Sequence, residues 1–107
     1  MRLFNVMIKN IDNQYIKYRI PFTKSESYLI KWLPKSQTKI HNHRGKNCDF
    51  ITFHKLYECT YSSLKIDDLL NSREIKPFNI YHINDKIGYH QIFNFDNKIK
   101  WSIHRYY

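Results

Sequence analysis

Short runs of β-branched and aromatic residues, separated by turn-forming residues, fill most of this 107-residue chain. Such runs are typical of β-strands, and many short strands in one small domain predict a sandwich or a barrel. The sequence therefore predicts an all-β fold, and a small jelly-roll barrel with a polar interior fits it best. The expected strands lie at 3–9, 14–20, 27–33, 40–43, 48–54, 56–62, 78–83, 88–95 and 98–106.

Alternation and turn signals refine this picture. Tyr15, Lys17 and Arg19 stand two apart and are expected on one face of a strand. Asp96-Asn97 predicts a two-residue hairpin between the last two strands. The exception to strand is 66–71, where at most one short helical turn is expected.

The length and apolar content fit a single domain spanning 1–107, with one modest core. No apolar run approaches the ~18 residues that a membrane span needs. The N-terminus lacks the basic, apolar and small-residue regions of a signal peptide. We therefore expect a soluble, cytoplasmic protein without a membrane partner, with thiols at Cys48 and Cys59.

The net charge of +9 raises the question of nucleic-acid binding. The lysines are scattered along the chain, however, and no run of five basic residues appears. Solvated surface lysines are the favoured interpretation. A basic nucleic-acid-binding module remains an alternative that rests on charge alone.

Three histidines stand out as candidate metal ligands. His41 and His43 are two apart, so on a strand both imidazoles face the same way. His90, in a later strand, would complete a set of three on one face of an ion. Neutral imidazoles suit Fe(II), Zn, Ni or Cu(II), and three protein ligands leave positions open for a substrate. The competing interpretation is a pair of exposed histidines and a hydrogen-bonded polar residue in a barrel.

Other polar residues accompany the histidines at regular spacing. Cys48 follows His43 by five residues, Gly88 precedes His90, and Ser102, His104 and Tyr106 alternate at the end of the chain. With these residues, and with Trp32 and the Leu56-Tyr57-Glu58 segment, the sequence resembles the cysteine dioxygenases, which are thiol dioxygenases of the cupin superfamily. The resemblance covers about 27–106.

This resemblance implies a non-haem Fe(II) enzyme that oxidises cysteine, or a related small thiol, with O2 to the sulfinic acid. His41, His43 and His90 would hold the iron. Tyr106 would lie beside the reacting atoms, with Ser102 orienting His104 and His104 orienting the Tyr106 hydroxyl. Cys48 matches a family cysteine that forms a thioether with the tyrosine, although a buried, unreactive thiol fits Cys48 equally well.

The substrate-binding cation departs most from the family pattern. The family binds the substrate carboxylate with an arginine on an early strand, where this chain offers Arg19 and Lys17. An arginine fork matches a carboxylate better than an ammonium does. The alternatives that stay open are a related thiol as substrate, such as mercaptopropionate or an N-terminal cysteine, and a degenerate or non-enzymatic cupin that binds a metal or small ligand.

Overall fold

The chain is described here from a computed structural model, which covers residues 15–84, 86 and 88–107. Nearly all regular structure is β-strand, as the sequence predicts. The strand expected at 3–9 lies outside the described residues. The elements are β1 (Tyr15–Arg19), β2 (Glu26–Trp32), β3 (Ser36–Gln37), β4 (Cys48–Thr52), β5 (Leu56–Tyr61), the 3-10 turn η2 (Ile66–Asp68), β6 (Leu69–Ile75), β7 (Ile80–Ile83), β8 (Tyr89–Asn94) and β9 (Lys100–Tyr106).

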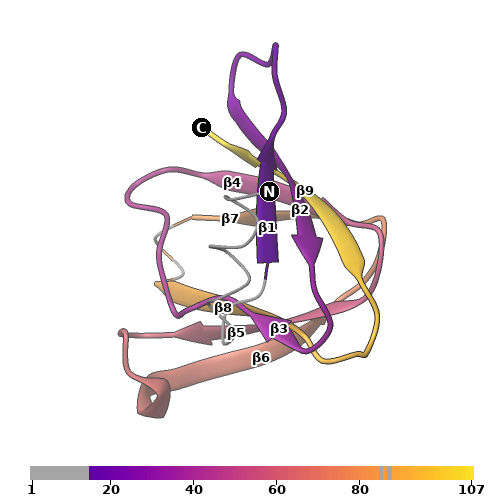
Figure 1. Cartoon of the computed structure of the whole chain (residues 1–107). Coiled ribbons are helices and arrows are strands. Elements are labelled where there is room, and N and C mark those ends of the chain that lie inside the picture. Colours follow the sequence, from indigo (N-terminus) through magenta and orange to yellow (C-terminus); the bar gives the residue numbers. More distant parts are fainter. Residues whose placement is uncertain (1–14, 85, 87) are drawn as a thin grey trace, which may run out of the picture.

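The strands form two antiparallel sheets that face each other (Figure 1). One sheet has the order β1-β2-β9-β4-β7 and the other has the order β3-β8-β5-β6. Neighbours in space are often far apart in sequence, because β9 pairs with β2 on one side and β4 on the other. This arrangement is the predicted jelly-roll barrel.

The inward faces of the two sheets bury a single apolar cluster. Residues from both sheets contribute to it, so burial of their apolar surface holds the sheets together. The cluster consists of Ile30, Trp32, Cys48, Phe50, Leu56, Ile75, Ile83 and Ile92. None of the helical segments in the described part of the chain is long and apolar enough to cross a membrane.

The short helical turn expected within 66–71 is confirmed as η2, after which the chain continues directly into β6. Two other local predictions are wrong. The stretch expected as a strand at 40–43 is a loop that touches the sheet only through an isolated bridge between His41 and His90. The connection between β8 and β9 runs over 95–99 and is therefore wider than the predicted two-residue hairpin. The Asn94 side chain donates a hydrogen bond to the Lys98 carbonyl across this loop.

The loop before β4 turns sharply at Arg44 and Gly45. Both residues have positive φ, of 53° and 84°. The Lys46 amide donates to the His43 carbonyl at 3.1 Å, which closes a turn of the type that requires positive φ at both central positions. Extended backbone cannot pass through this turn, so the His41–His43 segment ends there and the chain leads into β4 of the five-stranded sheet.

Candidate metal centre and its cavity

His41, His43 and His90 converge on one point. The Nε2 atom of His90 lies 3.1 Å from Nε2 of His41 and 3.1 Å from Nε2 of His43. All three candidate ligand atoms lie within 4.8 Å of one another. Two imidazoles at right angles on one ion, each at ~2.1 Å, have nitrogens ~3 Å apart. The distances around His90 therefore fit shared metal coordination.

Hydrogen bonds on the opposite ring nitrogens leave Nε2 available as the ligand atom. Nδ1 of His41 lies 2.7 Å from the Lys39 carbonyl, and Nδ1 of His90 lies 2.9 Å from Oε2 of Glu58. An acceptor at Nδ1 places the ring hydrogen there and the free lone pair on Nε2. Burial lowers the pKa of His41 to about 4, so this imidazole is neutral near pH 7, as a metal ligand must be.

Glu58 is the buried carboxylate behind the histidines. It projects inward from β5, and Arg73 on β6 donates from Nε to its Oε1 at 2.6 Å. Burial alone would raise the pKa of Glu58, but its hydrogen bonds to His90 and Arg73 hold that pKa below the usual value. From the sequence, Glu58 was noted only within the Leu56-Tyr57-Glu58 segment and was given no role of its own. A glutamate at an inward position of an alternating strand was the signal that could have identified it.

A second polar group lies on β9 and β4 and reaches the cavity through His104 and Tyr106. The Trp32 indole donates to Oγ of Ser102 at 2.8 Å, and Oγ of Ser102 lies 2.8 Å from Nε2 of His104. Nδ1 of His104 lies 3.9 Å from the sulfur of Cys48. The β4–β9 register places Cys48 opposite Tyr106. The structure thus brings together the four residues that the sequence singled out here: Cys48, Ser102, His104 and Tyr106.

Burial keeps these side chains in their neutral forms near pH 7. It lowers the pKa of His104 to about 3, and the ring stacks on Phe50 at 4.9 Å between centroids. It raises the pKa of the Cys48 thiol to about 12, against a hydrogen bond with Tyr106 that lowers it. Burial likewise raises the pKa of Tyr106. Cys48, Tyr106 and His104 therefore supply a thiol, a phenol and a neutral imidazole, respectively.

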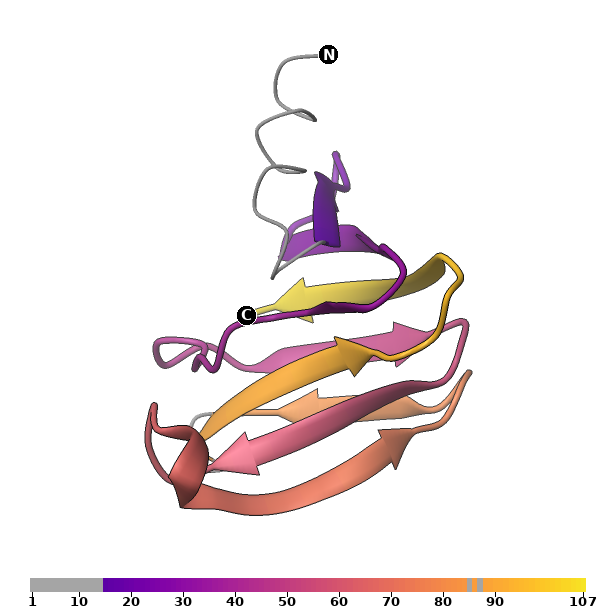
Figure 2. The same ribbon diagram turned by 60° about the horizontal axis from the view of Figure 1, so that its bottom comes forward.

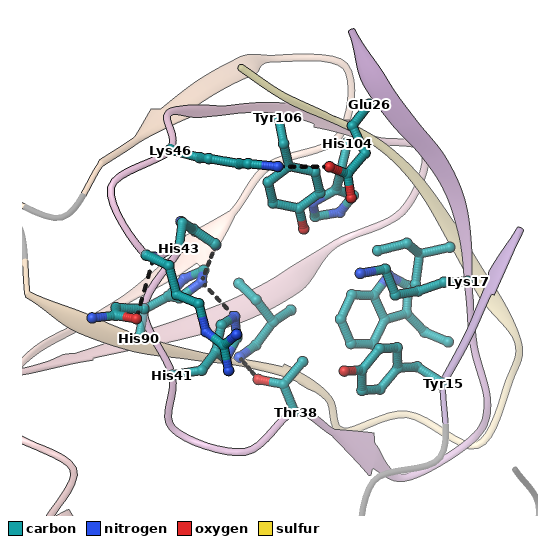
Figure 3. A pocket seen from close by; sticks show the side chains of 15 residues that line it. Tyr15, Lys17, Glu26, Thr38, His41, His43, Lys46, His90, His104 and Tyr106 are labelled. Carbon is teal, nitrogen blue, oxygen red and sulfur yellow. Dashed lines mark hydrogen bonds and ion pairs between the residues drawn. The ribbon is translucent and has the colours of Figure 1, made fainter. Parts of the chain in front are cut away.

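The three histidines line one open cavity of about 380 Å³ together with His104 and Tyr106. Cys48 and Ser102 contact His104 but are not among the lining residues. Figure 3 shows the histidines on one side and Tyr15 and Lys17 of β1 on the other, with His104 and Tyr106 between them. Among the described residues, the lining includes Lys17 and leaves out Arg19, whose guanidinium carbon lies 5.6 Å from the Tyr28 ring centre. Of the two cations predicted to bind substrate, only Lys17 faces the cavity.

The cavity rim also carries charged side chains that were given no role from the sequence. Lys46, from the histidine-bearing loop, makes a 2.8 Å ion pair with Glu26 at the start of β2. The Tyr28 hydroxyl donates to the other carboxylate oxygen of Glu26 at 2.6 Å. Arg44, from the same loop, also lines the cavity. Their proximity to the histidines depends on the turn at Arg44 and Gly45, which no pattern in the sequence indicated.

The sequence matches no protein-family model and no curated protein. Solved structures resemble the fold. They include the Cnp3 cupin domain of Schizosaccharomyces pombe, with a TM-score of 0.68 and 8% identity over 88% of this chain and 61% of that one. They also include oxalate oxidase, with a TM-score of 0.64 and 16% identity over 86% of this chain and 49% of that one. A third is the cupin domain of an XRE family transcriptional regulator from Enterobacter cloacae, with a TM-score of 0.65 and 13% identity over 87% of this chain and 95% of that one.

These likenesses show the fold alone. This chain spans 61% and 49% of the first two structures, so their larger chains include parts without a counterpart here. All three are nonetheless cupins or enzymes that share the two-sheet barrel, and most of the chain is covered in each comparison. The chain therefore has the double-stranded β-helix fold of the cupins.

Proposed function

We propose that the protein is a three-histidine Fe(II) thiol dioxygenase. The reaction joins a thiolate and O2 to give a sulfinate, RS⁻ + O2 → RSO2⁻, with both oxygen atoms on sulfur. The observation that carries the proposal is the shared cavity, which the histidine triad lines together with His104 and Tyr106. Cys48 and Ser102 support this wall through their contacts with His104. A metal-binding cupin without oxygen chemistry would not require that second group.

The donor set fits a ferrous ion. His41, His43 and His90 would hold it through Nε2, with the Lys39 carbonyl and Glu58 fixing two of the rings. A bound ferrous ion would supply open positions at which a thiol and O2 meet. Because imidazole ligands add no charge to a bound ion, the charge of the ion would stay uncompensated, which favours an anionic sulfur group over a neutral ligand.

The group on β9 and β4 would act through hydrogen bonds. Tyr106 stays protonated, so its hydroxyl can donate to negative charge that develops on oxygen. The Ser102 oxygen accepts from Trp32, which leaves the Ser102 hydrogen for Nε2 of His104 and the imidazole hydrogen on Nδ1, toward Cys48. This chain of contacts fixes the ring of His104, which in turn positions the Cys48 and Tyr106 pair.

We further propose that Cys48 and Tyr106, which are opposite each other in the β4–β9 register, form the thioether that the sequence resemblance implies. Forming a sulfur–carbon bond removes one hydrogen from the thiol and one from the phenol ring, and O2 would take both as hydrogen peroxide. The intact mass should then fall by two hydrogens after aerobic incubation with iron and thiol. Cys48→Ser should abolish the loss and Cys59→Ser should keep it. An unchanged mass would leave Cys48 as an unreactive buried thiol.

Lys17 is the residue we assign to the substrate carboxylate. It lies across the cavity from the histidines, its ammonium 5.5 Å from the centre of the Tyr106 ring (Figure 3). An ammonium there would hold the acid end of a thiol whose sulfur points toward the triad. Arg19, outside the lining, is not needed for this role.

Oxygen uptake tests the proposed function most directly. The iron-loaded chain should consume one O2 for each sulfinate formed, with cysteine and 3-mercaptopropionate compared as substrates. His90→Ala should abolish uptake, while His82→Ala, on the outside of the barrel, should retain it. An iron-loaded protein that binds metal but consumes no O2 with either thiol would instead be a non-enzymatic metal-binding cupin.

A further inference from the structure

The cavity holds more positive charge than a thiol with one acidic group needs. Its lining contains three cations, Lys17, Arg44 and Lys46, and one carboxylate, Glu26. Lys46 is paired with Glu26 at 2.8 Å, so these two charges largely offset each other. Lys17 and Arg44 remain as net positive groups in addition to any metal ion at the histidines.

Lys17 approaches the cavity from β1. Its ammonium lies 4.3 Å from the centre of the Tyr28 ring and 5.5 Å from that of Tyr106. These rings stabilise a cation without neutralising it. Within residues 15–84, 86 and 88–107, Lys17 makes no ion pair.

Arg44 approaches from the loop that carries the histidines. It follows His43 directly, and its backbone amide donates to Oδ1 of Asn42 at 3.3 Å. The turn closed between Lys46 and His43 fixes its position in the loop. Its guanidinium likewise has no carboxylate partner in the described part of the chain. A guanidinium fork is suited to a carboxylate, which it binds through two parallel hydrogen bonds.

We propose that Lys17 and Arg44 bind two separate acidic groups of one substrate, so that the substrate class is a small dicarboxylic thiol. This inference rests on the proposed thiol dioxygenase function. A thiolate with two carboxylates carries three negative charges, which complement a divalent ion held by neutral imidazoles together with two cations. A thiol with a single carboxylate leaves one of the cations without a partner in a partly enclosed cavity.

Kinetics with two matched thiols test the pairing. Mercaptosuccinate is 3-mercaptopropionate with one added carboxylate, so the two share the sulfur and the first acid group. We expect the wild-type KM to be about 10- to 100-fold lower for mercaptosuccinate, the size of one charge-assisted hydrogen-bonded pair. Arg44→Gln should remove this preference by raising the KM for mercaptosuccinate to about that for 3-mercaptopropionate. Lys24→Gln, which removes one positive charge outside the cavity lining, should preserve it.

Two kinetic outcomes would overturn the inference. The first is a wild-type enzyme that uses mercaptosuccinate no better than 3-mercaptopropionate. The second is an Arg44→Gln variant whose KM rises equally for both thiols, because Arg44 would then bind the single carboxylate that they share.

Binding of succinate, compared with propionate, separates this inference from the proposed function. Calorimetry on the full chain needs no turnover. Succinate should bind at least about 10-fold more tightly than propionate, and Arg44→Gln and Lys17→Gln should each remove most of that difference. If this pattern holds but no thiol consumes O2, the two-anion site stands and the proposed function fails. If succinate and propionate bind alike while thiols are oxidised, the function stands and the two-anion site is wrong.

Discussion

His104 is a neutral imidazole enclosed by aromatic rings, and its ionisation links the site to the stability of the barrel. Its ring stacks on Phe50 and lies 6.5 Å from the Trp32 ring. Burial lowers its pKa from the usual 6.5 to about 3. Between these two values the unfolded chain takes up a proton at this residue and the folded chain does not, so acid favours unfolding there.

The free energy of unfolding should therefore fall as the pH drops from about 6.5 toward about 3. His104→Gln removes the titrating ring, so its unfolding free energy should depend less steeply on pH across this window. Urea unfolding of both proteins at several pH values measures the two slopes. Parallel slopes would mean that His104 does not contribute to the acid sensitivity.

Glu58 should set the metal affinity without touching the ion. Glu58→Gln weakens the hydrogen bond that orients His90 and leaves Arg73 without its carboxylate. We expect metal binding to weaken about 10- to 100-fold, the usual effect of losing such a support. Competition with a chelating dye measures this affinity. Glu74→Gln, a neighbour on β6 that pairs only with exposed Lys55, is the matched control and should bind like wild type.

Individual residues of the site were predictable where a short motif carried them. The motifs identified His41, His43, His104 and Tyr106, which do line one cavity. They also identified Cys48 and Ser102, which contact His104 without lining the cavity. Glu58 was given no role, because its role depends on contacts with two residues that are distant in sequence. His90 lies on β8, and Arg73 lies on β6, a strand that was not predicted. Arg44 was missed because a single exposed arginine carries no pattern.

At the scale of elements, Gly88 controls where β8 begins and hence where His90 lies. Its φ is +98°, and a Cβ added there would stand 2.6 Å from the Tyr61 carbonyl oxygen. Gly45 also has positive φ, of +84°, but an added Cβ would meet nothing within 4 Å. Replacing Gly45 by alanine therefore tests the cost of positive φ alone, whereas replacing Gly88 adds the cost of a clash with the Tyr61 backbone.

Gly88→Ala should lower the free energy of unfolding by at least about 2 kcal/mol, because the variant adds a clash to an unfavourable φ. Gly45→Ala should cost only about 1 kcal/mol, the conformational part alone. Urea unfolding measures both values. Metal affinity should fall in Gly88→Ala because His90 is displaced with the strand. Equal destabilisation of the two variants would contradict the assigned close approach to Tyr61.

Alternation predicted most strands within a few residues, but it could not predict their interruptions. A break between 43 and 48 was expected, but nothing at 40–43 signalled a loop in place of a strand, and Arg44 is a residue that normally avoids positive φ. β6 was mistaken for part of a helical turn because Asp67-Asp68-Leu69-Leu70 shows no alternation. The strand forms because β5 supplies hydrogen-bonding partners along its length, with a register shift between Thr60 and Tyr61.

At the scale of the molecule, the metal centre joins a loop to the four-stranded sheet. His41 and His43 lie in the loop before β4, and His90 lies on β8. An ion bound by all three restrains the loop relative to the sheet, so binding to the folded state should raise stability by mass action. The barrel class followed from composition and alternation, whereas the division of the strands between the two sheets depends on long-range pairing that no local pattern encodes.

Adding Fe(II) or Zn(II) at about 100 times the dissociation constant should raise the free energy of unfolding by about 2.7 kcal/mol. Thermal unfolding with and without metal measures this gain. His90→Ala should abolish it, while His82→Ala should keep it, since His82 is exposed and pairs with Asp49 away from the cavity. A gain that survives His90→Ala would place the stabilising ion elsewhere.

The turn around η2 has a practical consequence. It lies at an outer corner of the barrel (Figure 2), and its leading residue Ile66 is 70% exposed. Of the described residues between Asp49 and Tyr89, none lines the cavity. The corner is thus a permissive place to splice in a fluorescent tag or an affinity peptide, where the graft would report on the protein while leaving its chemistry to proceed undisturbed.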